Sequence, residues 1–169
     1  MILKTDNLCL RHWRDSDDKV LYRLAKNPNI GPIAGWPPHT SVDDSLNIIK
    51  TVFVRPECYA ITKNNQIIGS IELLIHPNGN HWWGEGSAEL GYWIGEEYQG
   101  QGYATEACKI LIKRAFNDLN IERIFATYKK ENFASKRVLE KLGFKYFSQL
   151  NNIDYQNRQF VEIAVKLEK

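Results

Sequence analysis

Hydrophobic and polar residues follow a helical spacing in some stretches of this chain and a strand-like spacing in others. Residues 7–13 form a short strand-like run, and in residues 14–28 apolar side chains recur on one helix face. Asp15 or Ser16 is positioned to cap this first helix, and Pro28 follows its end. The pattern therefore predicts a strand followed directly by a helix.

A segment rich in proline and glycine, residues 31–40, comes next and is expected to be a loop. A second helix is expected after it, with its apolar residues in one stripe. Thr40 or Ser41 is the expected cap, and the helix should end before Pro56.

The middle of the chain changes period. Residues 58–63, 66–76 and 87–95 are β-rich runs separated by turn-forming residues, which predicts an antiparallel meander of three strands. Helical spacing returns after Gly102 and continues for roughly four turns.

The last part of the chain alternates again. Residues 123–128 indicate a strand, and residues 134–144 a helix that Gly143 ends. Residues 145–150 and 158–167 indicate two closing strands. The predicted fold is a mixed α/β (α+β) domain, whose central, mostly antiparallel sheet of about seven strands is flanked by about four helices.

Length and composition narrow the class of protein. The 169 residues fit one domain, 1–169, and 43% hydrophobic with 25% charged residues is typical of a folded, soluble protein. The net charge of +2 without a basic run predicts no nucleic-acid partner. No apolar run reaches about 18 residues, and no signal peptide is evident, so we expect a cytoplasmic protein without a membrane partner.

Three cysteines without close spacing, and four histidines without ligand spacing, predict neither disulfides nor a metal site. The candidate chemistry lies instead in the turn at residues 99–104, between a strand and a helix. Gly100 and Gly102 allow a ligand to approach the backbone, and a helix N-terminus favours phosphate. The spacing fits neither a Walker loop nor a dinucleotide fingerprint, and an ordinary strand-to-helix turn is the alternative.

The wider context decides between these readings by resemblance. Gln99, Gly102 and Ala104 match the Q-x-x-G-x-A pyrophosphate signature of the GNAT superfamily of acetyl-coenzyme A dependent N-acetyltransferases. Residues 131–144 resemble the later motif of the same family, and both ends of the chain resemble its Rim-type branch, which includes ribosomal-protein N-acetyltransferases. The resemblance covers nearly the whole chain and implies a splayed pair of central strands.

The resemblance implies the donor site. Main-chain N–H groups of the 99–104 turn would hold the pyrophosphate of acetyl-coenzyme A, and the opened strand edge would hold the pantetheine arm. Asn132 would contact the same arm, and it is also a candidate helix cap. The implied donor-binding residues are Tyr92, Trp93, Ile94, Gln99, Gly100, Gln101, Gly102, Tyr103, Ala104, Thr105, Asn132 and Ser135. For Tyr92 and Trp93, simple packing in the sheet is the alternative.

Acetyl transfer to an amine also needs a base and an acid. Glu89 is the preferred base, with Glu72 or water as alternatives, and apolar neighbours should raise the pKa of such a carboxyl. An outward-facing strand residue is the alternative for either carboxylate. Many family members carry a tyrosine that acts as general acid where this chain has Leu139. Ser135 is therefore expected to hydrogen-bond the sulfur of the leaving thiolate, and Tyr128 is a weaker candidate for that role.

The acceptor side is less defined. Trp36, His39 and Trp83 are the candidate contacts for an amine acceptor, either a protein N-terminus or a small molecule, although these tryptophans can equally cover the core or a subunit contact. We expect an N-acetyltransferase that acts in a ternary complex, as a monomer or homodimer. A non-catalytic acyl-coenzyme A sensor or scaffold is the main alternative, and another nucleotide-binding protein is a weaker one.

Overall fold

A computed structural model describes all residues, 1–169. It contains eight strands, five α-helices and two short 3₁₀ turns. The helices are α1 (Asp18–Ala25), α2 (Gly31–Ala34), α3 (Val42–Thr51), α4 (Tyr103–Asn117) and α5 (Phe133–Lys141), and the 3₁₀ turns are η1 (Asp15–Asp17) and η2 (Glu96–Tyr98). The strands are β1 (Ile2–Lys4), β2 (Cys9–Arg11), β3 (Cys58–Lys63), β4 (Gln66–Ile75), β5 (Ser87–Ile94), β6 (Arg123–Lys129), β7 (Lys145–Ile153) and β8 (Gln159–Glu168).

The strands form one mixed, mostly antiparallel sheet in the order β1-β2-β3-β4-β5-β6-β8-β7. The chain divides into two compact units, the first with residues 1–72 and 92–107 and the second with residues 73–91 and 108–169. Strands β4 and β5 each contribute residues to both units. The predicted fold class is confirmed, while the splay between central strands stays a prediction.

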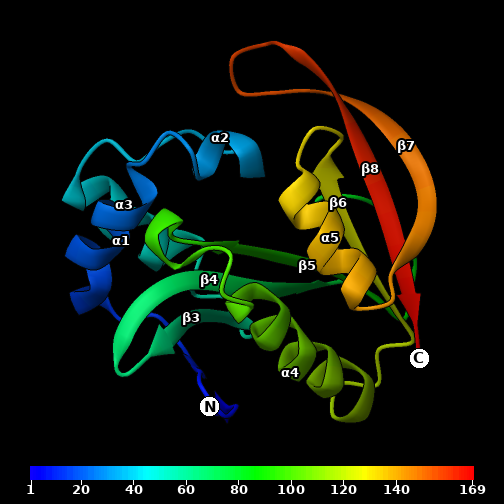
Figure 1. Cartoon of the computed structure of the whole chain (residues 1–169), viewed down its shortest axis with the longest axis horizontal. Coiled ribbons are helices and arrows are strands. Elements are labelled where there is room, and N and C mark those ends of the chain that lie inside the picture. The colour runs from blue at the N-terminus through cyan, green and yellow to red at the C-terminus, as the bar shows by residue number, and fades with distance from the viewer. The chain divides into compact units, whose positions relative to one another are not determined.

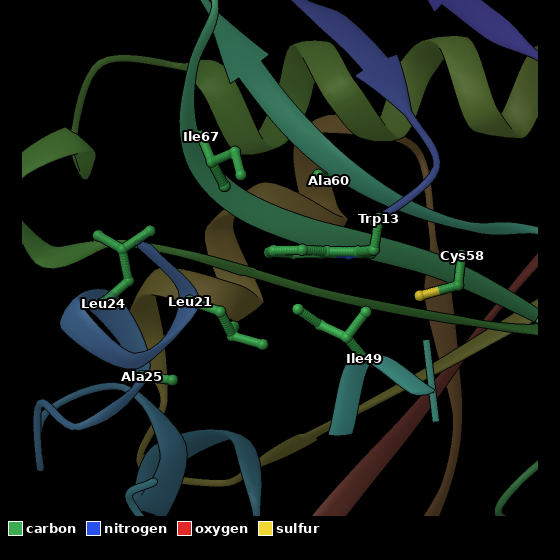
Figure 2. Packing of buried hydrophobic residues seen from close by; sticks show 8 residues of the cluster. All are labelled: Trp13, Leu21, Leu24, Ala25, Ile49, Cys58, Ala60 and Ile67. Atoms are coloured by element: carbon green, nitrogen blue, oxygen red, sulfur yellow. The ribbon is translucent and has the colours of Figure 1, made fainter. Parts of the chain in front are cut away.

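The first unit combines an antiparallel meander with a helical layer. Strands β1 to β4 pair with their sequence neighbours, and α1 packs on α3 (Figure 1). Figure 2 shows the core between them, where the side chains of Trp13, Leu21 and Ile49 face one another. The expected helical stripe is confirmed, because Leu21 and Leu24 are both buried.

The second unit contains the one parallel strand pair that the structure describes, β5 with β6, followed by antiparallel β8 and β7. Helix α5 packs on β6, and β7 and β8 form the long curved hairpin drawn in orange and red in Figure 1. The glycine stop at the end of α5 is confirmed, since Gly143 has a φ of +89°.

The structure corrects three local expectations. Residues Ile2–Lys4 add an eighth strand that the sequence pattern did not indicate. The expected loop at 31–40 contains the one-turn helix α2, which Gly35 ends at a φ of +100°. Neither Asp15 nor Ser16 caps the first helix: both lie in η1, and Asp17 accepts the hydrogen bond from the Arg14 N–H. The expected cap at Ser41 is confirmed, because its hydroxyl accepts from the Asp44 N–H at 3.0 Å.

Candidate active site

The turn at residues 99–104 has an open main chain. Gly100 and Gly102 have φ values of +72° and +83°, where glycine is favoured. A Cβ added to either glycine would meet no atom within 4 Å, so both face open space. The side-chain amide of Gln99 donates to the main-chain carbonyl of Ile94 at 2.9 Å, which links the turn to the end of β5. An uncovered main chain of this kind can lie directly against a ligand.

Helix α4 begins immediately after this turn. The Glu106 N–H donates to the carbonyl of Gly102 at 3.0 Å, which closes the first helical turn. The preceding N–H groups, of Tyr103, Ala104 and Thr105, have no intrahelical acceptor by helix geometry. Together with the dipole of a 15-residue helix, they fit the charge of a diphosphate. The residues of the turn therefore fit the group that the sequence predicts here.

Tyr103 differs from its neighbours because its side chain is buried. Its hydroxyl accepts a hydrogen bond from the Lys63 ammonium, which also lies 4.6 Å from the ring centroid. The side chain thus anchors the start of α4 on β3, and only the main chain of Tyr103 remains for a ligand. Gln101 is exposed, and its amide donates to the Glu97 carbonyl at 3.4 Å.

The end of β5 supplies the expected strand edge. Ile94 is buried, whereas Tyr92 and Trp93 are half-buried. A Cβ on Gly69 of β4 would lie 2.2 Å from the Trp93 carbonyl oxygen, so the two main chains approach closely there. Trp93 packs against the core of the first unit, as the alternative interpretation expected for at least one of these aromatics.

Trp36 and His39, two of the acceptor candidates, lie together in the first unit. Their ring centroids are 5.5 Å apart, and Trp36 also meets Trp93 edge to face at 5.7 Å. His39 shares a 2.8 Å hydrogen bond with the Ser45 hydroxyl, and burial lowers the pKa of its imidazole. Trp36 packs on the core, so it serves at least the covering role that the sequence left open.

Glu72 on β4 is half-buried and ion-paired. Its carboxylate lies 3.1 Å from the Arg55 guanidinium, and its side chain is 23% exposed. Residues alternate in direction along a strand, so Glu72 shares a face with Ser70, whose hydroxyl accepts from the Trp13 indole at 3.3 Å. Glu72 is therefore on the face of β4 that the core and the helices cover.

Glu89 in the second unit is buried, with 4% of its surface exposed. Its carboxylate accepts hydrogen bonds from the Asn80 amide at 2.8 Å and the Trp83 indole at 2.9 Å. The main-chain N–H of His81 adds a third at 3.3 Å. The alternative of an outward-facing strand residue is therefore wrong, because this side chain fastens the segment that precedes β5.

These contacts also overturn the expected pKa of Glu89. Burial alone would raise the pKa of the carboxyl, but the donated hydrogen bonds, that of His81 foremost, outweigh burial and hold the pKa below its usual value. The expectation counted apolar neighbours along the strand and missed the donors from residues 80–83. Glu89 is a carboxylate at neutral pH and a weaker base than predicted.

His81 and Glu162 are the principal residues that sequence reasoning missed. His81 places Nδ1 3.4 Å from a Glu89 oxygen and Nε2 3.3 Å from a Glu162 oxygen. Hydrogen bonds to Glu162 and then Glu89 raise the pKa of the imidazole to about 9. Glu162 also accepts from the Asn152 amide at 2.5 Å. The two carboxylates stand far apart in the chain, so spacing carried no signal of this cluster.

Trp83 packs inside the second unit. Its ring stacks on Phe125 at 4.5 Å with an interplanar angle of 5°, and Phe147 meets both rings edge to face. The neighbouring Trp82 is 76% exposed and contacts the His76 ring at 4.3 Å. The indole of Trp82, rather than that of Trp83, is the one presented to solvent.

Asn132 caps α5, as expected, because its side-chain oxygen accepts from the Ser135 N–H at 3.1 Å. Ser135 itself is half-buried in the first turn of the helix. Leu139, which stands where many family members carry a tyrosine that acts as the acid, is buried. Burial raises the pKa of Tyr128, the weaker candidate, with a further contribution from Glu140.

None of the helices combines the length and apolar character needed to cross a bilayer. No group of three or more histidine, cysteine or acidic residues is arranged to hold a metal ion.

Comparison with known proteins gives a consistent result. Residues 7–145 match the model of the acetyltransferase (GNAT) domain. The uncharacterized N-acetyltransferase YnaD of Bacillus subtilis (strain 168) is 26% identical over 147 residues, which cover 86% of this chain and 83% of that protein.

Solved structures match over nearly the full length. A GNAT-family acetyltransferase from Bacillus anthracis superposes with a TM-score of 0.85 at 22% identity, covering 99% of this chain and 98% of that one. The ribosomal L7/L12 α-N-protein acetyltransferase RimL, in complex with coenzyme A, gives a TM-score of 0.84 at 21% identity and the same coverage. At this level of identity the likeness shows the fold.

Proposed function

Because the chain belongs to the GNAT family of N-acetyltransferases, we propose that it transfers the acetyl group of acetyl-coenzyme A to a primary amine by direct attack in a ternary complex. The observation that carries this proposal is the open main chain of Gly100 and Gly102 at the start of α4. Its N–H groups and helix dipole match the diphosphate of the donor. RimL, of the same fold, is a protein acetyltransferase with coenzyme A bound.

In this proposal, the main chain of residues 99–105 holds the diphosphate, and the edge at residues 92–94 takes the pantetheine arm as an added strand. Asn132 contacts the same arm, in addition to capping α5. Ser135 donates a hydrogen bond to the sulfur as the thioester breaks, because buried Leu139 offers no proton.

The attacking amine must lose a proton, and Glu89 and Glu72 are the two candidate general bases. Glu89 accepts three hydrogen bonds from other groups and is almost fully buried, which favours a positioning role. Glu72 pairs with Arg55 at 3.1 Å, and 23% of its side chain is exposed, so an amine can reach it more easily than Glu89. We therefore assign proton removal to Glu72 or to water.

The acceptor is proposed to be a protein N-terminus or a small-molecule amine. Trp36, His39 and Trp83 remain the candidate contacts, although the packing of both tryptophans shows that each also has a structural role. The main rival is a non-catalytic acyl-coenzyme A sensor, which would bind the donor without transferring its acetyl group.

A matched pair of glycine variants tests the donor site. Gly102→Glu places a carboxylate where the diphosphate is proposed, and Gly84→Glu is the control, since Gly84 has a φ of +88° and also faces open space. Acetyl-coenzyme A should raise the melting temperature of the wild type and of Gly84→Glu, but not of Gly102→Glu. Stabilisation that survives in Gly102→Glu would overturn the placement of the diphosphate.

A panel of amines, including short peptides with free N-termini and spermidine, tests catalysis by release of free thiol from acetyl-coenzyme A. Glu72→Gln should lower kcat by about two to four orders of magnitude if Glu72 is the sole base. An unchanged rate assigns the role to water. Donor binding without thiol release for every amine would favour the sensor.

A further inference from the structure

Both ring nitrogens of His81 face carboxylates. Nδ1 lies 3.4 Å from Glu89 and Nε2 lies 3.3 Å from Glu162. A neutral imidazole carries one donor and one acceptor nitrogen, whereas an ionised carboxylate only accepts. The two contacts can therefore both be hydrogen bonds only if His81 is an imidazolium. Against the effect of burial, the donated hydrogen bonds keep the pKa of Glu89 and that of Glu162 below their usual value, so both are ionised at neutral pH, and the raised pKa of His81 agrees with an imidazolium.

We propose that His81, as an imidazolium at neutral pH shared by Glu89 and Glu162, is a positioning residue that fixes the segment 76–86 as an acceptor-binding element. The proposal rests on the amine-transfer function above. It deepens that function by naming the segment that the acceptor meets and the side chain that holds the segment in place.

The segment 76–86 is held at its C-terminal end by hydrogen bonds from Glu122 and Arg123 to main-chain carbonyls, and in its middle by Glu89 and His81. Glu89 receives three donors from residues 80–83, so one buried carboxylate holds the middle of the segment to β5. His81 also pairs with Glu162 on β8, and the side-chain amide of Asn152 on β7 donates to the same carboxylate. These contacts link the segment to both strands. The only large hydrophobic side chain of the segment left exposed is Trp82, whose ring rests on His76. Fixing His81 therefore fixes how Trp82 is presented.

The neighbouring strands carry further charged groups. On β6, Lys129 lies opposite Glu162 in register and places its ammonium 4.6 Å from the Phe160 ring centroid. On β8, Lys166 lies 5.6 Å from the Phe147 centroid and pairs with Glu168. The only charged residue of β7 is Lys145, at the far end of the strand. By itself, the cluster of two carboxylates and one imidazolium has a net charge of −1, and Lys129, opposite Glu162 in register, offsets this charge.

The protonation state can be tested without any activity. In ¹⁵N-detected NMR of the histidine rings, the His81 signals, assigned by their loss in His81→Gln, should show two protonated nitrogens at pH 7.5. Hydrogen exchange of the segment 76–86 should quicken at least tenfold in His81→Gln, and much less in His81→Arg, which keeps a cation. A neutral His81 at pH 7.5 overturns the proposal. Equal hydrogen-exchange rates of the segment 76–86 in the wild type, His81→Gln and His81→Arg overturn it as well.

The acceptor role is tested by kinetics with the most active amine of the panel. His81→Gln should raise the KM for that amine about tenfold, while the affinity for coenzyme A stays within twofold. His81→Arg should restore the KM to within about threefold and keep it low above pH 9, where that of the wild type rises. The control His12→Gln removes a histidine outside this segment, whose ring stacks on Tyr59.

The outcomes separate the two hypotheses. If His81→Gln and the control His12→Gln have the same KM and the same pH profile, the positioning role is wrong although the enzyme is an acetyltransferase. If no amine is acetylated, the proposed function fails, and with it the acceptor role. The ring protonation and exchange data then still confirm or refute the imidazolium and its hold on the segment.

Discussion

The charge on His81 should be visible in the stability of the protein as a function of pH. The pKa of its imidazole is about 9 in the folded protein, against an ordinary value of 6.5. At about 1.4 kcal/mol per pKa unit, this difference corresponds to roughly 3 kcal/mol of stabilisation. The side chain is 23% exposed, so solvent screening reduces the figure only in part.

The sign and the pH window follow from linkage. Because the folded protein binds this proton more tightly than the unfolded chain, the stabilisation is complete below pH 6.5. It is lost progressively as the pH rises from 6.5 to about 9, and it is absent above that. The perturbation is therefore His81→Gln, which removes the titrating group and preserves a single donor.

The assay is urea denaturation at intervals from pH 6 to pH 10, with the free energy of unfolding compared between proteins at each pH. Burial raises the pKa of the Cys58 and Cys108 thiols, so the unfolded chain gains stability from their ionisation at high pH. That effect is common to both proteins and cancels in the difference. His76→Gln is the control for loss of a histidine in the same segment.

The wild type should exceed His81→Gln by at most roughly 3 kcal/mol near pH 6, and the difference should close by pH 9.5. His76→Gln keeps the His81 cluster, so its advantage over His81→Gln should likewise narrow as the pH rises. A constant difference between wild type and His81→Gln across this range would refute the argument, because it would mean that the folded and unfolded proteins bind this proton equally.

Three further substitutions test single contacts. Gly69→Ala forces a Cβ to 2.2 Å from the main-chain oxygen of Trp93, and we expect a loss of about 3 kcal/mol or failure to fold, measured by thermal and urea unfolding. Asn132→Ala should cost about 1 kcal/mol through loss of the α5 cap, and Asn132→Asp should recover most of it in the same assay. Trp83→Phe keeps the stacked ring but removes a donor from ionised Glu89, so urea unfolding should show a loss of about 2 kcal/mol; no loss would mean that water replaces the indole.

The elements of this fold were largely readable from local pattern. Ser41 and Asn132 cap the helices they were expected to cap, and Gly143 ends α5, because each of these effects involves residues only a few positions apart. The short strand Ile2–Lys4 was missed because three residues carry too little periodicity to stand out.

The site divides in the same way. The turn at Gly100 and Gly102 could be identified as a phosphate-binding candidate because strand, glycine turn and helix follow one another in the chain. The state of Glu89 could not. The direction of its pKa shift depends on hydrogen bonds donated by Asn80, His81 and Trp83, in the segment that precedes β5.

The sequence by itself determined the period of each element, the bare turn before α4 and the family to which the motifs point, since all of these are encoded in contiguous residues. Only the tertiary structure decided which carboxylates are buried, which donors meet them and that His81 stands between Glu89 and Glu162. Electrostatic energies depend on distances across strands, and those distances exist only once the chain has folded.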